Sequence, residues 1–146
     1  MPRRQEKVDK RPSLSLAIET NVIRVKPMTY DTENIFARII RGEIAADKVY
    51  EDDYVLAFHD IAKLTPIHVL IIPKMAYNSI DDFSGRASDA ELAAYMRAIG
   101  VVARELGVSQ TGYRVVTNSG ADANQEVMHF HSHIFGGRKL GGVRPS

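Results

Sequence analysis

The sequence predicts an α+β fold in which an antiparallel sheet of about five strands packs with two helices. Three observations support this class. The strand-like apolar runs are short, turn-like segments join them, and the 3.6-residue periodicity of helices appears in two stretches. With 146 residues and 45% apolar residues, the chain suits one domain that can bury a core.

The first 27 residues differ in charge from the rest of the chain. They carry seven basic and three acidic residues, so they contribute +4 to a net charge of +1 and leave −3 for the remainder. We expect residues 1–27 to form a disordered basic extension, in which 14–25 could add a strand, and residues 28–146 to form the folded domain. The extension has no aromatic residue for base stacking, which disfavours nucleic-acid binding.

A short helix and a hairpin begin the patterned part of the chain. Asp31 and Thr32 are candidate N-caps for a helix that ends at Gly42 and whose apolar face is Ile35, Phe36, Ile39 and Ile40. Residues 49–51 and 55–59 then predict two strands around an acidic turn.

A buried strand and a long helix follow. Residues 68–72 are apolar on both faces, which predicts a central strand that ends at Pro73. Residues 74–87 have no clear period and predict an irregular segment. Ser88 and Glu91 form a capping box that opens a helix closed by Gly107, with an apolar side of Leu92, Tyr95, Met96, Ile99, Ala103 and Leu106.

The last two predicted strands carry the main chemical feature. They cover residues 113–117 and 127–135, joined by a turn that begins at Asn118. Side chains alternate along a strand, so the second strand would point three histidines to one face: His129, His131 and His133. Burying three polar rings brings no packing benefit, which favours a functional site over core histidines.

Composition excludes several kinds of site and location. There is no cysteine, so a disulfide framework, a thiolate nucleophile and a Cys-ligated metal are ruled out. No apolar run approaches the roughly 20 residues of a membrane span, and the N-terminus lacks the apolar stretch of a secretory signal. We therefore expect a cytoplasmic protein without membrane association.

Two chemical roles fit the histidine run. The histidines could ligate zinc, with His68 of the central strand as a third ligand. Alternatively, one imidazole could attack phosphorus, because a side chain with a pKa near 6.5 is largely neutral at pH 7. The turn 118–125 could then supply backbone N–H donors for the phosphoryl oxygens.

Residues 124–138, Asn-Gln-Glu-Val-Met-His-Phe-His-Ser-His-Ile-Phe-Gly-Gly-Arg, resemble the signature of the histidine triad (HIT) family. The resemblance continues upstream in the right order, through 35–36, 50–52, 57–61, 65–68 and 72–74. The Gly-Gly-Arg at 136–138 and a histidine at 133 resemble the Hint-like branch, the purine nucleoside phosphoramidase type. The resemblance implies a HIT-like fold.

For mechanism, the resemblance implies a nucleotide hydrolase or transferase that needs no cofactor or metal. His131 would attack the α-phosphorus of a purine nucleoside 5′-phosphoramidate or an acyl-nucleotide and form a nucleotidyl-histidine. His133 would contact the phosphate and leaving group. His129 and His68 would form a hydrogen-bonded shell that orients His131.

For binding, the resemblance implies a pocket built from three parts. Asp60 would accept from the ribose hydroxyls. An apolar slot beside His59 would hold the base, formed by Ile35, Phe36, Ile39, Phe58 and Ile61. Asn118, Gln125 and Glu126 would contact the phosphate. Three places depart from the family pattern: Asn124 stands where glycine is usual, residues 74–76 lack a histidine that is common there, and Ser132 replaces an apolar residue.

Two alternative functions remain open, a dinucleoside polyphosphate hydrolase and a nucleotide-binding regulatory module without turnover. For the phosphoramidase function we expect a homodimer with the long helix near the interface.

Overall fold

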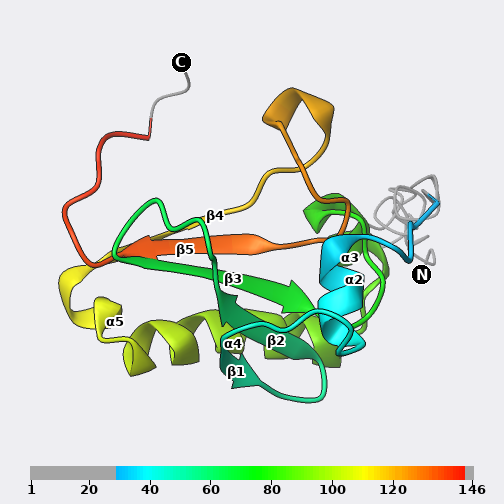
Figure 1. The fold of residues 1–146 in the computed structure, drawn as a ribbon, viewed down its shortest axis with the longest axis horizontal. Helices are drawn as coiled ribbons and strands as arrows, with labels where there is room; N and C mark the ends of the chain where they lie inside the picture. The colour runs from blue at the N-terminus through cyan, green and yellow to red at the C-terminus, as the bar shows by residue number, and fades with distance from the viewer. Residues whose placement is uncertain (1–28, 144–146) are drawn as a thin grey trace, which may run out of the picture.

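A computed structural model describes residues 29–143. The expected extension over 1–27, with its candidate strand, lies outside the described residues. An antiparallel five-stranded sheet has the order β1-β2-β3-β5-β4 (Figure 1). Its strands are β1 (Lys48–Glu51), β2 (Val55–His59), β3 (Ile67–Pro73), β4 (Tyr113–Val116) and β5 (Ser132–Gly136). The predicted α+β class and sheet are confirmed.

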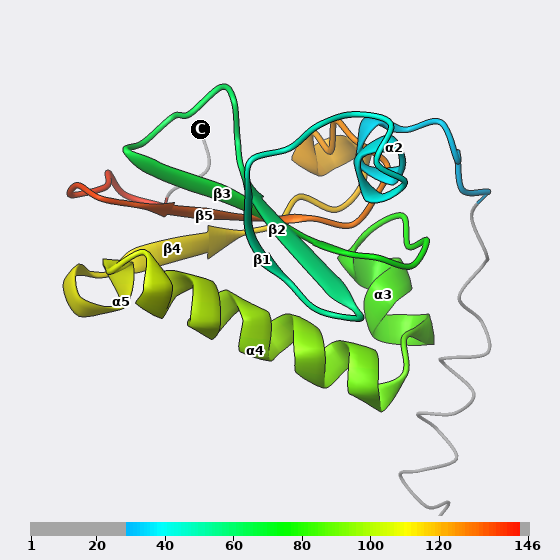
Figure 2. The same ribbon diagram turned by 60° about the horizontal axis from the view of Figure 1, so that its bottom comes forward.

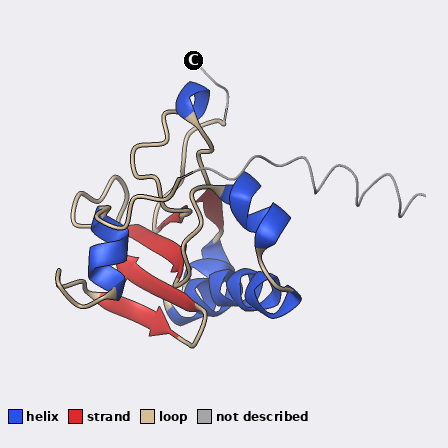
Figure 3. Cartoon of the chain, turned by 90° about the vertical axis from the view of Figure 1, so that its right-hand side faces the viewer, coloured by secondary structure: helices blue, strands red, loops and turns tan. Residues whose placement is uncertain are grey.

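The described chain has more helices than the two predicted. They are α2 (Ile35–Ile40), α3 (Ile80–Arg86), α4 (Asp89–Glu105) and α5 (Val108–Thr111), with a 3₁₀ turn η1 (Ala121–Ala123) in the segment that projects from the sheet between β4 and β5 (Figure 3). The prediction of an irregular segment over 74–87 was therefore wrong, since it contains α3. A helix of 7 residues is too short to show an apolar stripe, although Ser79 caps it by accepting from the N–H of Asp82.

The long helix α4 confirms the predicted capping box, because Ser88 and Glu91 bond to each other's backbone N–H groups. It buries Tyr95, Ala98, Ile99, Val102 and Ala103 against the sheet. Met96 was expected on this apolar side but is 70% exposed. It lies about 100° around the helix from Tyr95, beyond the buried stripe.

Helices cover both faces of the sheet (Figure 2). Val69 and Ile71 of β3 pack in the core cluster beneath α4. Leu70 and Ile72 point the other way and pack with Phe36 of α2 in a second cluster. This double burial explains why β3 is apolar on both faces, as expected of a central strand.

Two predicted boundaries were wrong. The N-cap of α2 is Asn34 rather than Asp31 or Thr32, because its side chain accepts from the N–H of Ala37 at 2.9 Å. The last strand begins at Ser132 rather than at residue 127. Its pairing with β3 reaches Ile71 and Ser132, and continuing this register would bring Phe130 opposite Pro73, which has no N–H to donate.

None of the helices within residues 29–143 combines the length and apolar character needed to cross a bilayer.

Candidate active site

A cavity of about 640 Å³ lies on the α2 side of the sheet. Many of the residues predicted for a site line it: Ile35, Phe36, Ile39, Phe58, His59, Asp60, Ile61, Asn118, Glu126, His131 and His133. His68, His129 and Gln125 were also predicted, but they are not among the residues that line it. The cavity thus brings together an apolar slot, two of the predicted carboxylates and three of the predicted histidines.

The hydrogen bond of His131 determines which of its two ring nitrogens is unprotonated. Its Nδ1 lies 2.8 Å from the backbone oxygen of His129. A carbonyl oxygen only accepts, so Nδ1 carries the proton and Nε2 keeps the lone pair. The ring is 7% exposed, and this burial lowers its pKa, against the smaller opposing effect of the hydrogen bond to His129. His131 is therefore neutral at pH 7.

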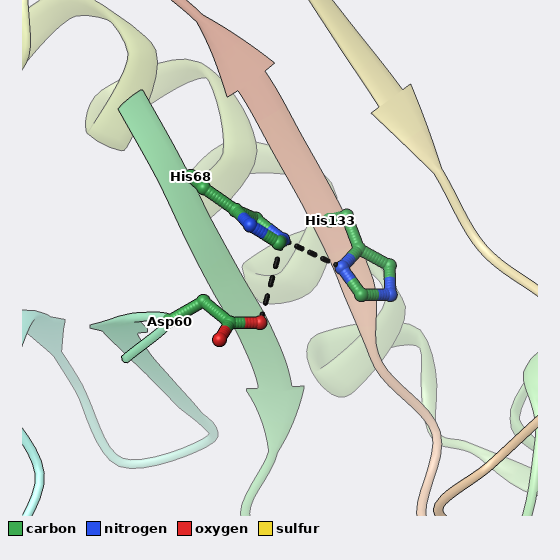
Figure 4. Close-up of side chains that lie close together, drawn as sticks. All are labelled: Asp60, His68 and His133. Atoms are coloured by element: carbon green, nitrogen blue, oxygen red, sulfur yellow. Dashed lines mark hydrogen bonds and ion pairs between the residues drawn. The ribbon is translucent and has the colours of Figure 1, made fainter. Parts of the chain in front are cut away.

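A second chain of hydrogen bonds gives His133 the opposite tautomer. The N–H of Leu64 donates to Nδ1 of His68 at 3.2 Å, so His68 carries its proton on Nε2. This Nε2 donates to Nδ1 of His133 at 2.9 Å (Figure 4). His133 must then hold its own proton on Nε2.

Burial keeps both members of this pair neutral. Desolvation and the nearby rings of His131 and His68 together lower the pKa of His133 to about 4, against the opposing charge of Asp60. Desolvation also lowers the pKa of His68, with the charge of Asp60 acting against it. His131 and His133 therefore present neutral imidazoles to the cavity, His131 with a lone pair on Nε2 and His133 with a proton on Nε2.

The geometry differs from the expected shell around His131. The side chain of His68 bonds to His133, not to His131. The ring of His129 is 0% exposed and bonds to the hydroxyl of Tyr30 and the oxygen of Pro73, while its backbone carbonyl makes the contact to His131. His129 and His131 precede β5, so strand alternation does not set their directions.

Asp60 and His59 supply polar atoms to the cavity. Oδ1 of Asp60 accepts from the N–H of Ala62 at 2.8 Å, and Oδ2 lies 3.4 Å from Nε2 of His68. Nδ1 of His59 is buried without a hydrogen-bond partner among residues 29–143. A buried nitrogen without a partner costs free energy unless a ligand or water bonds to it.

The loop between β4 and β5 differs in part from the expected phosphate-binding turn. Gln125 serves the loop itself: its side chain bonds to the N–H of Gly120 and to the carbonyls of Asn78 and Val127. The backbone N–H groups of Asn124 and Gln125 bond to carbonyls at 121 and 120, so neither is free for phosphate. Asn118, Asn124 and Glu126 do line the cavity.

Asn124 adopts the left-handed conformation, with φ 56° and ψ 41°. Asparagine tolerates this region better than most residues with a side chain. Its presence where the motif has glycine is therefore compatible with the turn.

The cavity's charged lining is acidic. Asp47, Asp60 and Glu126 are its carboxylates, and the lining formed within residues 29–143 contains no lysine or arginine. Such a cavity is poorly suited to a ligand with several negative charges.

The match to a known family agrees with this geometry. The HIT domain matches residues 41–140. The chain belongs to the HIT family. A HIT-like protein of Azospirillum brasilense is 57% identical over 113 residues, covering 77% of this chain and 93% of the relative. The purine nucleoside phosphoramidase of Escherichia coli K12 is 41% identical over 109 residues, covering 75% of this chain and 91% of the relative.

Solved structures of HIT proteins have the same fold. A histidine triad protein from Clostridium difficile matches with a TM-score of 0.70 and 41% identity, over 80% of this chain and 100% of that one. A histidine triad nucleotide-binding protein from Candida albicans matches with a TM-score of 0.69 and 29% identity, over 78% and 84%. The predicted HIT-like fold and Hint-like resemblance are confirmed.

Sequence reasoning missed part of the HIT cavity. Leu70 and Phe135 could have been found from strand alternation, because Phe135 lies two residues beyond His133 and Leu70 pairs with His133. The other missed residues come mostly from loops, where no local period marks them: Ile44, Ala45, Ala46, Asp47, Leu64, Val116, Asn124 and Val127.

The residues that could hold zinc differ from the expected set, which was the histidine run with His68. Ligand atoms of Asp60, His68 and His133 lie within 4.8 Å of one another, whereas His129 is bonded elsewhere. Imidazole and carboxylate are suitable zinc ligands. Binding would have to remove the proton that His68 shares with His133, so the metal and the hydrogen bond compete for the same nitrogen.

Proposed function

We propose that this HIT protein hydrolyses, or transfers from, purine nucleoside 5′-phosphoramidates and acyl-nucleotides through a nucleotidyl-histidine. One observation carries the proposal: His131 and His133 line the same cavity in opposite tautomers. The lone pair on Nε2 of His131 is a nucleophile that needs no separate base. The N–H at Nε2 of His133 is a hydrogen-bond donor for developing negative charge.

The first step joins Nε2 of His131 to the α-phosphorus. The bond from phosphorus to the leaving group breaks with its electron pair. A carboxylate leaves without a proton, whereas an amine takes one from solvent in the same step. His133 donates a hydrogen bond to the phosphoryl oxygen or leaving group and keeps its proton.

The second step is attack by water on the phosphorus of the adduct. The bond to Nε2 of His131 breaks, nucleoside monophosphate leaves, and the proton of water passes to solvent. The hydrogen bond from Nδ1 to the carbonyl of His129 stabilises His131 while it carries positive charge in the adduct.

The rest of the cavity suits a nucleoside. Its apolar slot includes Phe36 and Phe58, whose rings meet edge to face with 5.8 Å between their centroids. Asp60 lines the cavity, which supports it as the acceptor for the ribose hydroxyls through Oδ2. The phosphoramidase name of the relative from Escherichia coli supports a purine base.

The acidic lining favours phosphoramidates over the main enzymatic alternative. A dinucleoside polyphosphate carries at least three negative charges, and the lining within residues 29–143 offers three carboxylates without a lysine or arginine. A phosphoramidate or acyl-nucleotide carries one negative charge on its phosphoryl group, so its total repulsion from these carboxylates is smaller.

The test compares substrates and traps the intermediate. Wild type and His131→Ala are given adenosine phosphoramidate and, separately, diadenosine polyphosphates, and quenched protein is mapped by mass spectrometry. We expect AMP release from the phosphoramidate, an adduct on His131 and loss of activity of at least about a thousandfold in the variant.

Each alternative has its own outcome. AMP release from the dinucleotide alone would favour the polyphosphate hydrolase. AMP binding without turnover would favour the regulatory module. Activity that disappears with a chelator and returns with zinc would favour a metal at Asp60, His68 and His133.

The assembly and location remain predictions of the same proposal. Met96, exposed on α4, is an apolar residue that a homodimer interface near this helix would cover. Light scattering of wild type and Met96→Glu checks the dimer. Cell fractionation checks the expected cytoplasmic location.

A further inference from the structure

The ring of His129 is held at both nitrogens. It is 0% exposed, its Nε2 lies 2.8 Å from the oxygen of Pro73, and its Nδ1 lies 2.5 Å from the hydroxyl of Tyr30. The carbonyl of Pro73 only accepts, so Nε2 carries the proton and Nδ1 has the lone pair. The hydroxyl of Tyr30 must therefore donate to His129.

The backbone of the same residue holds His131. The carbonyl of His129 accepts from Nδ1 of His131 at 2.8 Å. The pairing of β3 with β5 ends at Ser132, so this carbonyl lies outside the ladder. The adjoining N–H, on Phe130, donates to the carbonyl of Tyr77 at 2.7 Å and anchors one side of the peptide.

Side-chain packing joins these parts. The rings of Tyr30 and His129 meet edge to face, with 5.7 Å between their centroids. The ring of Phe36 packs edge to face on both histidine rings, with centroid distances of 6.3 Å to His129 and 5.0 Å to His131. Displacement of the His129 ring therefore affects both the carbonyl that bonds to His131 and the packing around it.

We propose that Tyr30 is a positioning residue for His131, acting through His129. Its hydroxyl fixes the ring of His129, which fixes the carbonyl that holds the proton of His131 on Nδ1. The proposal rests on the function proposed above, in which Nε2 of His131 is the nucleophile. Tyr30 lies outside the cavity lining, so it acts without touching substrate.

The distinguishing variant is Tyr30→Phe, which removes one hydroxyl and keeps the ring. We expect kcat for adenosine phosphoramidate to fall roughly three- to tenfold, the range for loss of one supporting hydrogen bond. We expect KM to change less than about twofold, because the binding surface is unchanged. The matched control is Tyr54→Phe, since Tyr54 is 41% exposed.

A second measurement reads the nucleophile directly. Long-range proton–nitrogen NMR of the histidine rings shows which nitrogen carries the proton. We expect wild type and Tyr54→Phe to show His131 protonated on Nδ1, and Tyr30→Phe to show a mixture of tautomers. The Nδ1 signal of His129 should also move toward that of a nitrogen without a hydrogen bond.

The outcomes separate this inference from its alternatives. A lower kcat, a steady KM and a changed His131 tautomer would support it. An unchanged His131 tautomer in Tyr30→Phe would overturn the inference, even if kcat falls. A fall in kcat that accompanies a lower unfolding temperature would then show that Tyr30 has a purely structural role. If wild type hydrolyses no nucleotide, the proposed function fails, while the tautomer still decides whether Tyr30 positions His131.

Discussion

Nε2 of His68 lies 2.9 Å from Nδ1 of His133, and this contact determines that His133 presents a proton to the cavity. The two residues are 65 positions apart and belong to neighbouring strands, β3 and β5. Their hydrogen bond depends on the N–H of Leu64, which occupies the other nitrogen of His68.

Replacing His68 should weaken catalysis more than binding. His68→Leu removes the donor and leaves Nδ1 of His133 without a fixed partner. We expect kcat to fall about 10–100-fold, as for other residues that orient a catalytic group. His68→Gln keeps an N–H donor and should retain more activity. Equal losses of kcat in the two variants would contradict this role of the hydrogen bond.

The pH profile of kcat/KM should extend further into acid than an ordinary histidine allows. Burial lowers the pKa of His131 below 6.5, and the attacking form is the neutral ring. Activity should therefore fall only as the pH drops through the lowered pKa, below 6.5. Initial rates, corrected for hydrolysis without enzyme, measure this profile. An acid limb centred at or above pH 6.5 would be inconsistent with a buried neutral nucleophile.

Asn124 should tolerate glycine and resist β-branched residues. It has a positive φ, unlike the other described residues that are not glycine. We expect Asn124→Gly to be nearly neutral and Asn124→Val to cost about 1–2 kcal/mol of unfolding free energy. Urea titrations measure both. Ala123→Val is the control on the same loop, and an equal cost there would rule out backbone strain as the cause.

Ser132 should contribute to stability through Tyr95. Their hydroxyl oxygens lie 2.9 Å apart, and the hydroxyl of Tyr95 also donates to the carbonyl of Ile71 at 2.9 Å. Since Tyr95 has one proton, Ser132 supplies the other hydrogen bond.

A double-mutant cycle measures this pair. Ser132→Ala and Tyr95→Phe should each destabilise the protein, with a coupling energy of about 1 kcal/mol. Unfolding free energies of the two single variants and the double variant give the value. Additive losses would show that the two hydroxyls act independently.

Local sequence patterns predicted most helices and strands, because the interactions that start and end these elements lie within a few residues. The capping box of Ser88 and Glu91 and the apolar run before Pro73 are complete within a few residues. The short helix α3 was missed because its stability comes from packing Phe83 against Tyr77 and Tyr95 rather than from periodicity. The start of β5 was missed because it depends on the partner strand.

Residue order and spacing were enough to predict the family, the sheet and the apolar slot beside His131 and His133, because a linear chain carries that information. Which nitrogen of each ring holds a proton depends on the folded arrangement. That choice depends on the partners of the rings, such as the hydroxyl of Tyr30, which lies 99 positions from His129. Hydrogen bonds between distant segments form when the chain folds, so no local pattern encodes the roles of the individual histidines.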